Sequence, residues 1–558
     1  MSAADTVARD IFQRRVVGVA EEMSAALRRS AFSSIIWEMY DYSCALFTAD
    51  GRMIAQAETI AAQLGIMEMA CARINETVPI ASWCDGDVIV CNDPYRGCTH
   101  TPDVVMFTPV FLDEKLVAIA STIAHHVDIG GKSPCTTVPD NTEIFGEGLI
   151  LPPMKIIKAG VENPEVFAIL AANVRVPTAS LGDLRAQIAG CRTGEQRTRD
   201  LLRRYGTERF ARLCEEILDY GEAYMRASIR ALGSSAALRS SSAMIYIEDG
   251  VASDEPIAIS CQVTLNGDSL HVDFTGSSEQ RANALNCPIA STLSMVSYAV
   301  KAVLAPDSIQ NGGCTRPIQV IAPAGSVLNP NRPAAVGSRH YAQQAVAEAV
   351  LKALVPMSPD LLYSGSQISF PAFKAGGFDR RSEKLDGRND APYFAITDLL
   401  GGGGATNRGD GMNGIDTHGG NCEILSAEVM ERLCPIRVVR TELVVDSGGA
   451  GQFRGGLGLR RDYELLCDGV NVNAYVQQTD ERTRPWASDG GEPGSMAQVM
   501  LNPGAAQQLE LPSKAMGLKL DAGTVIRLQS SGGGGWGEPA KRTAASIQSD
   551  SDLGLVSD

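Results

Sequence analysis

Apolar residues recur at three- and four-residue steps over the first thirty positions, and this spacing predicts a helix. Phe12, Val16, Val19, Met23 and Leu27 fall on one face of it. Such a stripe is typical of a helix that packs on a protein core. From about residue 37 to 127 the pattern changes to short β-rich runs, separated by Asp-Gly and Asn-Asp-Pro turns. This segment predicts a sheet.

Helical spacing returns at about 182–232, with many charge pairs four residues apart, and predicts two antiparallel helices packed together. Two alternating runs around Asn266 and Gly267 then predict a β-hairpin. Apolar stretches near 288–305 and 341–354 predict two further helices.

The last third of the chain is dense in glycine, at 401–404, 447–458 and 532–537. None of these runs matches the phosphate-binding pattern G-x-x-x-x-G-K-[ST]. We expect them to form tight turns and close crossings of backbone between β elements, because glycine has no side chain to keep two main chains apart. The last twenty residues predict a tail or an arm that docks on another chain.

Helices and strands come in blocks and do not alternate regularly, which predicts an α+β fold with several domains and mixed or antiparallel sheets. We predict an N-terminal domain over 1–235 that carries a metal site and a helical pair. A central α+β domain over 236–380 follows, and then a glycine-rich C-terminal β region and tail over 381–558.

Charge and composition exclude several classes of function. The 558 residues include 49 Lys and Arg against 65 Asp and Glu, a net charge of -16 that opposes binding to nucleic acid or to an anionic membrane. The N-terminus lacks the pattern of a secretory signal, and the most apolar stretch, 285–305, contains polar residues that suit a buried helix. We therefore expect a cytoplasmic protein. Its 14 cysteines include no C-x-x-C pair, which indicates reduced thiols in the core.

Three of the six histidines fall within 27 residues, and this cluster is the sharpest chemical signal in the chain. His100 and Asp103 have H-x-x-D spacing, which on a loop lets a nitrogen and a carboxylate oxygen converge on one metal ion. His125, at the end of an apolar run, would supply a third ligand if that strand lies beside the loop. Adjacent His125 and His126 point to opposite faces of a strand, so only one can face the site. The alternative is a hydrogen-bonded surface pair without a metal.

Several longer runs carry a resemblance to a known family. They are GDVIVCNDPYRGCTHTPDVVMFTPVF, AHHVDIGG, TEIFGEGLILPP, GDLRAQIAGCRTG, VDFTGSSEQRANALNCP, DSGGAGQFRGGLG and GGGGWGEP, in this order between about residues 36 and 540. Together they resemble the hydantoinase B/oxoprolinase family, which includes the B subunits of ATP-dependent hydantoinases and lactamases and related subunits of acetone and acetophenone carboxylases.

The resemblance implies a division of labour between two chains. A hydantoinase A-type subunit would bind ATP and phosphorylate an oxygen of a poorly reactive substrate, and this chain would complete the reaction in a heterotetramer or larger assembly. The family's metal ligands map onto His100, Asp103 and His125, with Asp41 in the site or beside it. The metal would be divalent: zinc or manganese, with iron as a third option.

The leading hypothesis is therefore the metal-dependent subunit of an ATP-dependent amidohydrolase that opens a hydantoin, a lactam or an oxoproline-like cyclic amide. Asp41 would take a proton or share in metal binding, and His126 or Asp128 would orient the metal ligands. One alternative is a subunit of an ATP-dependent ketone carboxylase with the same ligands. Another is a non-catalytic scaffold for an ATPase partner.

Overall fold

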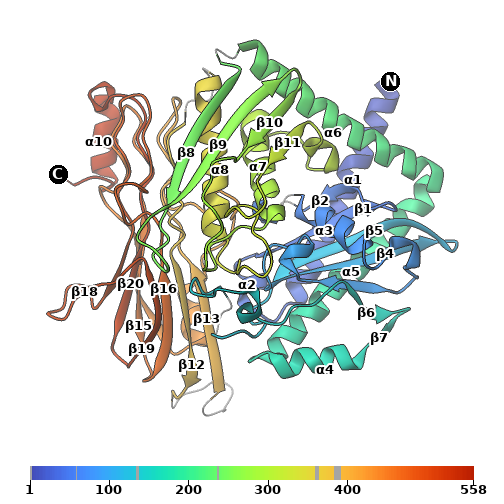
Figure 1. Cartoon of the computed structure of the whole chain (residues 1–558), viewed down its shortest axis with the longest axis horizontal. Helices are drawn as coiled ribbons and strands as arrows, with labels where there is room; N and C mark the ends of the chain where they lie inside the picture. Colours follow the sequence, from blue (N-terminus) through green and yellow to red (C-terminus); the bar gives the residue numbers. More distant parts are fainter. Residues whose placement is uncertain are drawn as a thin grey trace.

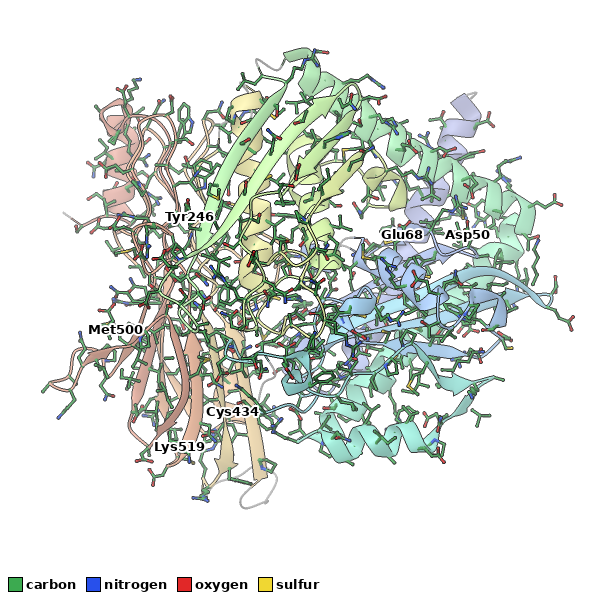
Figure 2. All side chains as sticks on the ribbon, in the orientation of Figure 1. Asp50, Glu68, Tyr246, Cys434, Met500 and Lys519 are labelled. Carbon is green, nitrogen blue, oxygen red and sulfur yellow. The ribbon has the colours of Figure 1, made fainter. Side chains whose placement is uncertain are left out.

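A computed structural model describes residues 3–57, 59–63, 65–133, 137–235, 238–358, 363–381, 391–416 and 418–557 of the chain. Within these residues it contains ten α-helices and four sheets, which confirms the α+β fold class (Figure 1). The side-chain view marks three successive parts: Asp50 and Glu68 in the N-terminal part, Tyr246 in the central part, and Cys434 and Lys519 in the C-terminal part (Figure 2).

The N-terminal part is built on a seven-stranded antiparallel sheet, as the short β-rich runs predict. Helices α1 (Ala3–Ser30) and α5 (Pro177–Tyr205) pack on one face of it, and α3 (Ile66–Asn75) packs on the other. The strand order is β2 (Met53–Gln56), β1 (Tyr42–Thr48), β5 (Lys115–His125), β4 (Asp103–Leu112), β3 (Val88–Cys91), β6 (Met154–Lys158) and β7 (Val161–Glu162). The apolar stripe of α1 is buried, which confirms its predicted packing role.

The segment predicted to be two antiparallel helices is helical, but its helices have different partners. α5 packs mainly along α1, and α6 (Thr207–Ser235) extends toward the central part (Figure 1). Gly190 permits this close crossing, since a Cβ there would lie 3.2 Å from Leu27 Cβ and 3.2 Å from Thr122 Cγ2. The expected pairing of the two helices with each other was wrong, because helical spacing does not specify which helix is the neighbour.

The central part packs two helices, α7 (Ile289–Leu304) and α8 (His340–Leu354), against a four-stranded sheet. Its strand order is β11 (Ile318–Ile321), β10 (Ser269–Asp273), β9 (Ile257–Asn266) and β8 (Ser240–Ile247). Asn266 pairs with Ser269 across the turn, where Gly267 has a φ of 64°. The predicted hairpin and both predicted helices are confirmed.

The C-terminal part contains two sheets that share one apolar core. Between them Phe373 stacks on Tyr463 with ring centroids 4.1 Å apart. One sheet has the order β13 (Ala391–Asp398), β12 (Ala372–Asp379), β16 (Val470–Tyr475) and β19 (Lys514–Leu520), and the other β14 (Ile436–Leu443), β15 (Leu459–Leu465), β20 (Val525–Gln529), β17 (Gln498–Leu501) and β18 (Leu509–Glu510). The shorter helices of the chain are α2 (Ser34–Trp37), α4 (Pro164–Asn173), α9 (Ala427–Leu433) and α10 (Ala544–Asp552).

The glycine runs lie against one another and exchange backbone hydrogen bonds, as predicted. Gly456 N–H donates to Gly403 O at 2.8 Å, Gly533 N–H donates to Gly456 O at 2.9 Å, and Gly449 N–H donates to Gly533 O at 2.9 Å. These backbones pass so closely that a Cβ on Gly533 would overlap the main chain of Gly403 and Gly404. Glycine is therefore required here for packing.

Residues 539–557 contact their own chain, and docking on another chain stays a prediction. Arg542 forms ion pairs with Asp410 at 2.8 Å and with Asp550 of α10 at 2.6 Å. The predicted domain limits stay predictions, and residues 236–237, next to the first limit, lie outside the described residues.

Most cysteines that the structure describes are buried free thiols, as expected; Cys84 is exposed and Cys422 is half-buried. Within the described part of the chain, no helix combines the length and apolar character needed to cross a membrane.

Replacing Gly533 by Ala tests the packing of the glycine runs. We expect a loss of about 3 kcal/mol in unfolding free energy, because backbone must move to accept the new methyl group. Gly18 of α1 is the matched control: a Cβ there meets nothing within 4 Å, and Gly18→Ala should stabilise its helix by up to about 1 kcal/mol. Calorimetric unfolding measures both, and equal midpoints for the two variants would contradict this account.

Candidate metal centre

The pairing of β4 with β5 brings an aspartate and a histidine together at one end of the N-terminal sheet. Asp103, the first residue of β4, lies directly opposite His125, the last residue of β5. Directly opposite residues of an antiparallel pair project to the same face, so both side chains point to one spot. His126 N–H then donates to Pro102 O at 2.9 Å, beside the loop that carries His100.

That loop, between β3 and β4, is held by the fully buried amide of Asn92. Asn92 Nδ2 donates to Thr101 O at 2.6 Å and to Leu149 O at 2.9 Å, and Asn92 Oδ1 accepts from Leu151 N–H at 2.6 Å. These bonds fix the loop backbone next to His100. The backbone between His100 and Asp103 is thereby held in one conformation.

His100, Asp103 and His125 converge on one point. His100 Nε2 lies 3.0 Å from Asp103 Oδ1 and 3.1 Å from His125 Nδ1, and His125 Nδ1 lies 2.9 Å from Asp103 Oδ1. Atoms bound at about 2.1 Å to one cation, at angles near 90°, lie about 3.0 Å apart. The three atoms have the spacing of one face of an octahedral metal site. Within the described residues, this is the one group of His, Cys, Asp or Glu side chains whose potential metal-binding atoms converge on one point.

The protonation of His100 supports the same interpretation. Its Nδ1 lies 3.0 Å from the carbonyl of Gly337, which can only accept, so Nδ1 carries the hydrogen and Nε2 presents a lone pair. Burial, and then the positive charge of Arg339, lower the pKa of His100 to about 4, so the ring is neutral at neutral pH. A lone pair then faces a carboxylate oxygen at 3.0 Å, and a cation between them fits this donor set.

The second oxygen of Asp103 is held from two sides. Thr99 Oγ1 donates to Asp103 Oδ2, and Arg339 Nη2 donates to the same oxygen at 2.9 Å. Burial alone would raise the pKa of Asp103, but His100, His125 and Arg339 outweigh it and hold the pKa well below 3.8. The carboxylate is therefore ionised and fixed in orientation. Arg339 directly precedes α8, 236 residues after Asp103, and no local sequence pattern connects the two.

Asp41 lies at the open edge of the group. Its Oδ2 is 3.8 Å from His125 Nδ1, and its side chain is 26% exposed, against 3% for His100 and 2% for Asp103. Desolvation raises the pKa of Asp41 to about 6. Asp398 of β13 is near enough for its charge to raise that pKa further, although sequence reasoning did not identify it. The centre thus receives side chains from the N-terminal, central and C-terminal parts.

His126 and Asp128, predicted to be catalytic, have other contacts. His126 is buried on the opposite face of the sheet from His125, with Nε2 2.9 Å from Gln187 Oε1 of α5. Asp128 accepts from Arg175 Nη1 at 3.0 Å. The described contacts of both residues lie within the surrounding scaffold, and neither belongs to the group formed by His100, Asp103 and His125.

Comparison with known protein families assigns the chain to one of them. Residues 5–539 match the hydantoinase B/oxoprolinase family. The chain belongs to this family. The resemblance of its sequence runs to hydantoinase B/oxoprolinase proteins is thereby confirmed, over nearly the whole length.

Individual relatives match nearly the whole chain. It is 31% identical to a candidate B chain of a D-/L-hydantoinase from Pseudomonas sp. (strain NS671), over 95% of this chain and 90% of that protein. The crystal structure of ATP-dependent caprolactamase from Pseudomonas jessenii superposes with a TM-score of 0.90 at 26% identity, covering 100% of this chain and 95% of that one. A nucleotide-free acetone carboxylase has a TM-score of 0.90 at 18% identity, covering 99% and 78%, and shows a shared fold.

Substituting Thr99 tests the support of the ligand carboxylate. Thr99→Val keeps the shape of the side chain but removes the hydrogen bond to Asp103, and we expect metal affinity to fall about 10- to 100-fold. Thr108→Val is the matched control, because Thr108 is a buried threonine of β4 whose side chain lies beside Cys191 of α5. Titration of the metal-free chain with Zn²⁺ or Mn²⁺ measures both. Equal affinity of Thr99→Val and wild type would contradict the role assigned to Thr99.

Proposed function

We propose that this chain is the metal-dependent subunit of an ATP-dependent amidohydrolase that opens a cyclic amide. The observation that carries the proposal is the convergence of two imidazole nitrogens and one carboxylate oxygen at about 3.0 Å from one another. Family membership and the similarity to hydantoinase and caprolactamase subunits support the cyclic amide as substrate.

His100, Asp103 and His125 would hold a divalent metal ion, and mixed nitrogen and oxygen ligands suit zinc, manganese or iron. Such an ion polarises a carbonyl or phosphoryl oxygen and makes bound water more acidic. Three protein ligands leave further coordination positions for water and substrate. Those positions would open toward Asp41, which is the most exposed carboxylate of the group.

The chain's residues would act on a substrate that the partner has already activated. Transfer of a phosphoryl group from ATP to the amide oxygen makes the amide carbon more electrophilic. Water then adds to that carbon and Asp41 takes its proton; the same proton passes to the ring nitrogen as the C–N bond breaks, which leaves an acyl phosphate and an amine. A second water hydrolyses the acyl phosphate to a carboxylate and inorganic phosphate. Arg339, beside Asp103, would add positive charge near the phosphoryl group.

This chemistry requires a second chain for ATP. Two of the relatives are named as B or beta subunits, which supports a hydantoinase A-type partner that binds the nucleotide. We expect a heterotetramer or larger assembly in the cytoplasm. A ketone carboxylase subunit is the second candidate, since an acetone carboxylase shares the fold and the same ligands could serve carboxylation.

Incubating the purified two-subunit complex with ATP, labelled bicarbonate and a panel of hydantoins, lactams, 5-oxoproline and ketones separates these functions. We expect a ring-opened amino acid and one phosphate per turnover, with no label in the product. Stable incorporation of label into a ketone would establish carboxylation instead. ATP hydrolysis without any change in the organic substrate, even with added metal, would support the scaffold alternative.

Replacing Asp41 by Asn distinguishes a proton acceptor from a metal ligand. Because the three converging ligands stay intact, we expect kcat to fall about 10²- to 10⁴-fold while the metal content is unchanged. Asp113→Asn in an exposed turn is the matched control. Loss of metal together with activity would make Asp41 a ligand, and full activity would remove it from the mechanism.

His100→Ala gives the complementary result. Removing one of three ligands should lower both the metal content and ring opening by more than about 100-fold, because two donors hold a divalent ion weakly. His271→Ala on β10 is the control, since His271 lies in the sheet of the central part and its ring Nε2 is 3.4 Å from Asn266 Nδ2. Turnover by His100→Ala at the wild-type rate would refute the proposed function.

A further inference from the structure

A pair of adjoining cavities of 490 Å³ each lies outside the three converging ligands, between the central and C-terminal parts of the chain. α7 lines both cavities, and residues 59–61, 403–416 and 418–421 contribute to the remaining walls. Three polar side chains are common to the two: Tyr298, Asp416 and His418. Each volume is in the range of small-molecule sites.

His418 is the unusual residue in this wall. It is 6% exposed, and its Nε2 donates to Glu348 Oε2 at 2.5 Å. Glu348 of α8 is buried and also accepts from Trp486 Nε1 at 2.8 Å and from the Ser366 N–H at 3.1 Å, so several donors hold the carboxylate still. The other nitrogen of His418, Nδ1, is buried and has no hydrogen-bond partner within the described part of the chain. A buried polar atom without a partner is rare and points to a missing ligand or water.

Asp416 presents a carboxylate to the same space. Its Oδ2 accepts from the backbone N–H groups of Asn421 and Cys422, at 2.8 Å each, which fixes the carboxylate plane. The ring of Tyr298 lies 6.1 Å from that of His418, at 62° to it. Asp416, Tyr298 and His418 thus line the same space, and His418 has an imidazole nitrogen that is buried and unpaired in the described structure.

These three groups suit an organic ammonium ion. A carboxylate and an imidazole lone pair accept its N–H groups, and an aromatic face attracts its charge. A second metal ion fits less well, since in the described residues only His100, Asp103 and His125 converge at metal-ligand spacing. Ala302 and Pro306 supply apolar wall for an alkyl chain.

We propose that this cavity binds the ammonium end of a small linear amino acid, the chemical class released when a cyclic amide is opened. The ammonium would lie between Asp416 and His418 with Tyr298 beside it. The identity of the ligand rests on the proposed function, whereas the ammonium site rests on the cavity itself. Asp416 also lies close enough to Asp41 for the two charges to interact, which places the cavity beside the metal centre.

Calorimetric titration of the purified full-length chain with 6-aminohexanoate tests the site, with hexanoate as the ligand that lacks the ammonium group. We expect one molecule of 6-aminohexanoate to bind per chain and hexanoate to bind at least about tenfold more weakly. Asp416→Asn keeps an oxygen for the two backbone N–H groups, removes the charge, and should weaken 6-aminohexanoate about tenfold or more. His418→Asn, which tolerates the φ of 38° at this position, should also weaken it.

Asp113→Asn, in the exposed turn that follows β4, is the matched control, because it removes a carboxylate charge at the far end of that strand from Asp103 and should leave this binding within about twofold. Thermal unfolding of each variant verifies that it is folded. No binding of 6-aminohexanoate to wild type, or equal binding by wild type and both cavity variants, would overturn the inference. Loss of binding in Asp41→Asn but not in Asp416→Asn would place the amino acid at the metal centre and also overturn it. Binding by a complex that opens no cyclic amide would refute the proposed function and leave the ammonium site standing.

Discussion

The register between β4 and β5 is the constraint on which the candidate centre depends. Asp103 and His125 share a face at the sheet end because they are directly opposite in an antiparallel pair. A shift of one residue would turn one of the two to the other face, where His126 contacts α5. Ten residues of β4 and eleven of β5, most of them buried, fix that register. Packing of the N-terminal core therefore determines the position of the ligands.

The centre also depends on the junction with the central part. Gly337 O sets the tautomer of His100, and Arg339 binds the outer oxygen of Asp103. Two neutral imidazoles and one carboxylate together carry a charge of minus one. Arg339 balances this charge at the carboxylate oxygen that faces away from the two imidazoles. A buried carboxylate without such partners would be costly, so the arrangement stabilises the ionised form that a metal requires. Separation of the two parts would remove both interactions.

Much of the fold follows from local patterns in the sequence. The stripe of α1, the short β-rich runs of the first sheet and the turn at Gly267 each depend on neighbouring residues, and each was predicted. The packing partner of α5 was not predicted. It depends on which neighbouring helix fits closely against Gly190, and helical spacing does not specify that helix. The convergence of three side chains could be predicted because His100 and Asp103 are close in sequence and His125 ends a strand. Arg339 and Asp398 come from other parts of the chain, and only the three-dimensional structure brings them near.

X-ray absorption spectroscopy of the metal-loaded chain tests the central claim most directly, because it reports the atoms around the ion itself. The account predicts two imidazole nitrogens and at least one oxygen at about 2.0–2.2 Å, with no sulfur. The spectrum of His125→Ala should then show one imidazole fewer. A sulfur shell, or a spectrum without imidazole scattering, would contradict a centre formed by His100, Asp103 and His125.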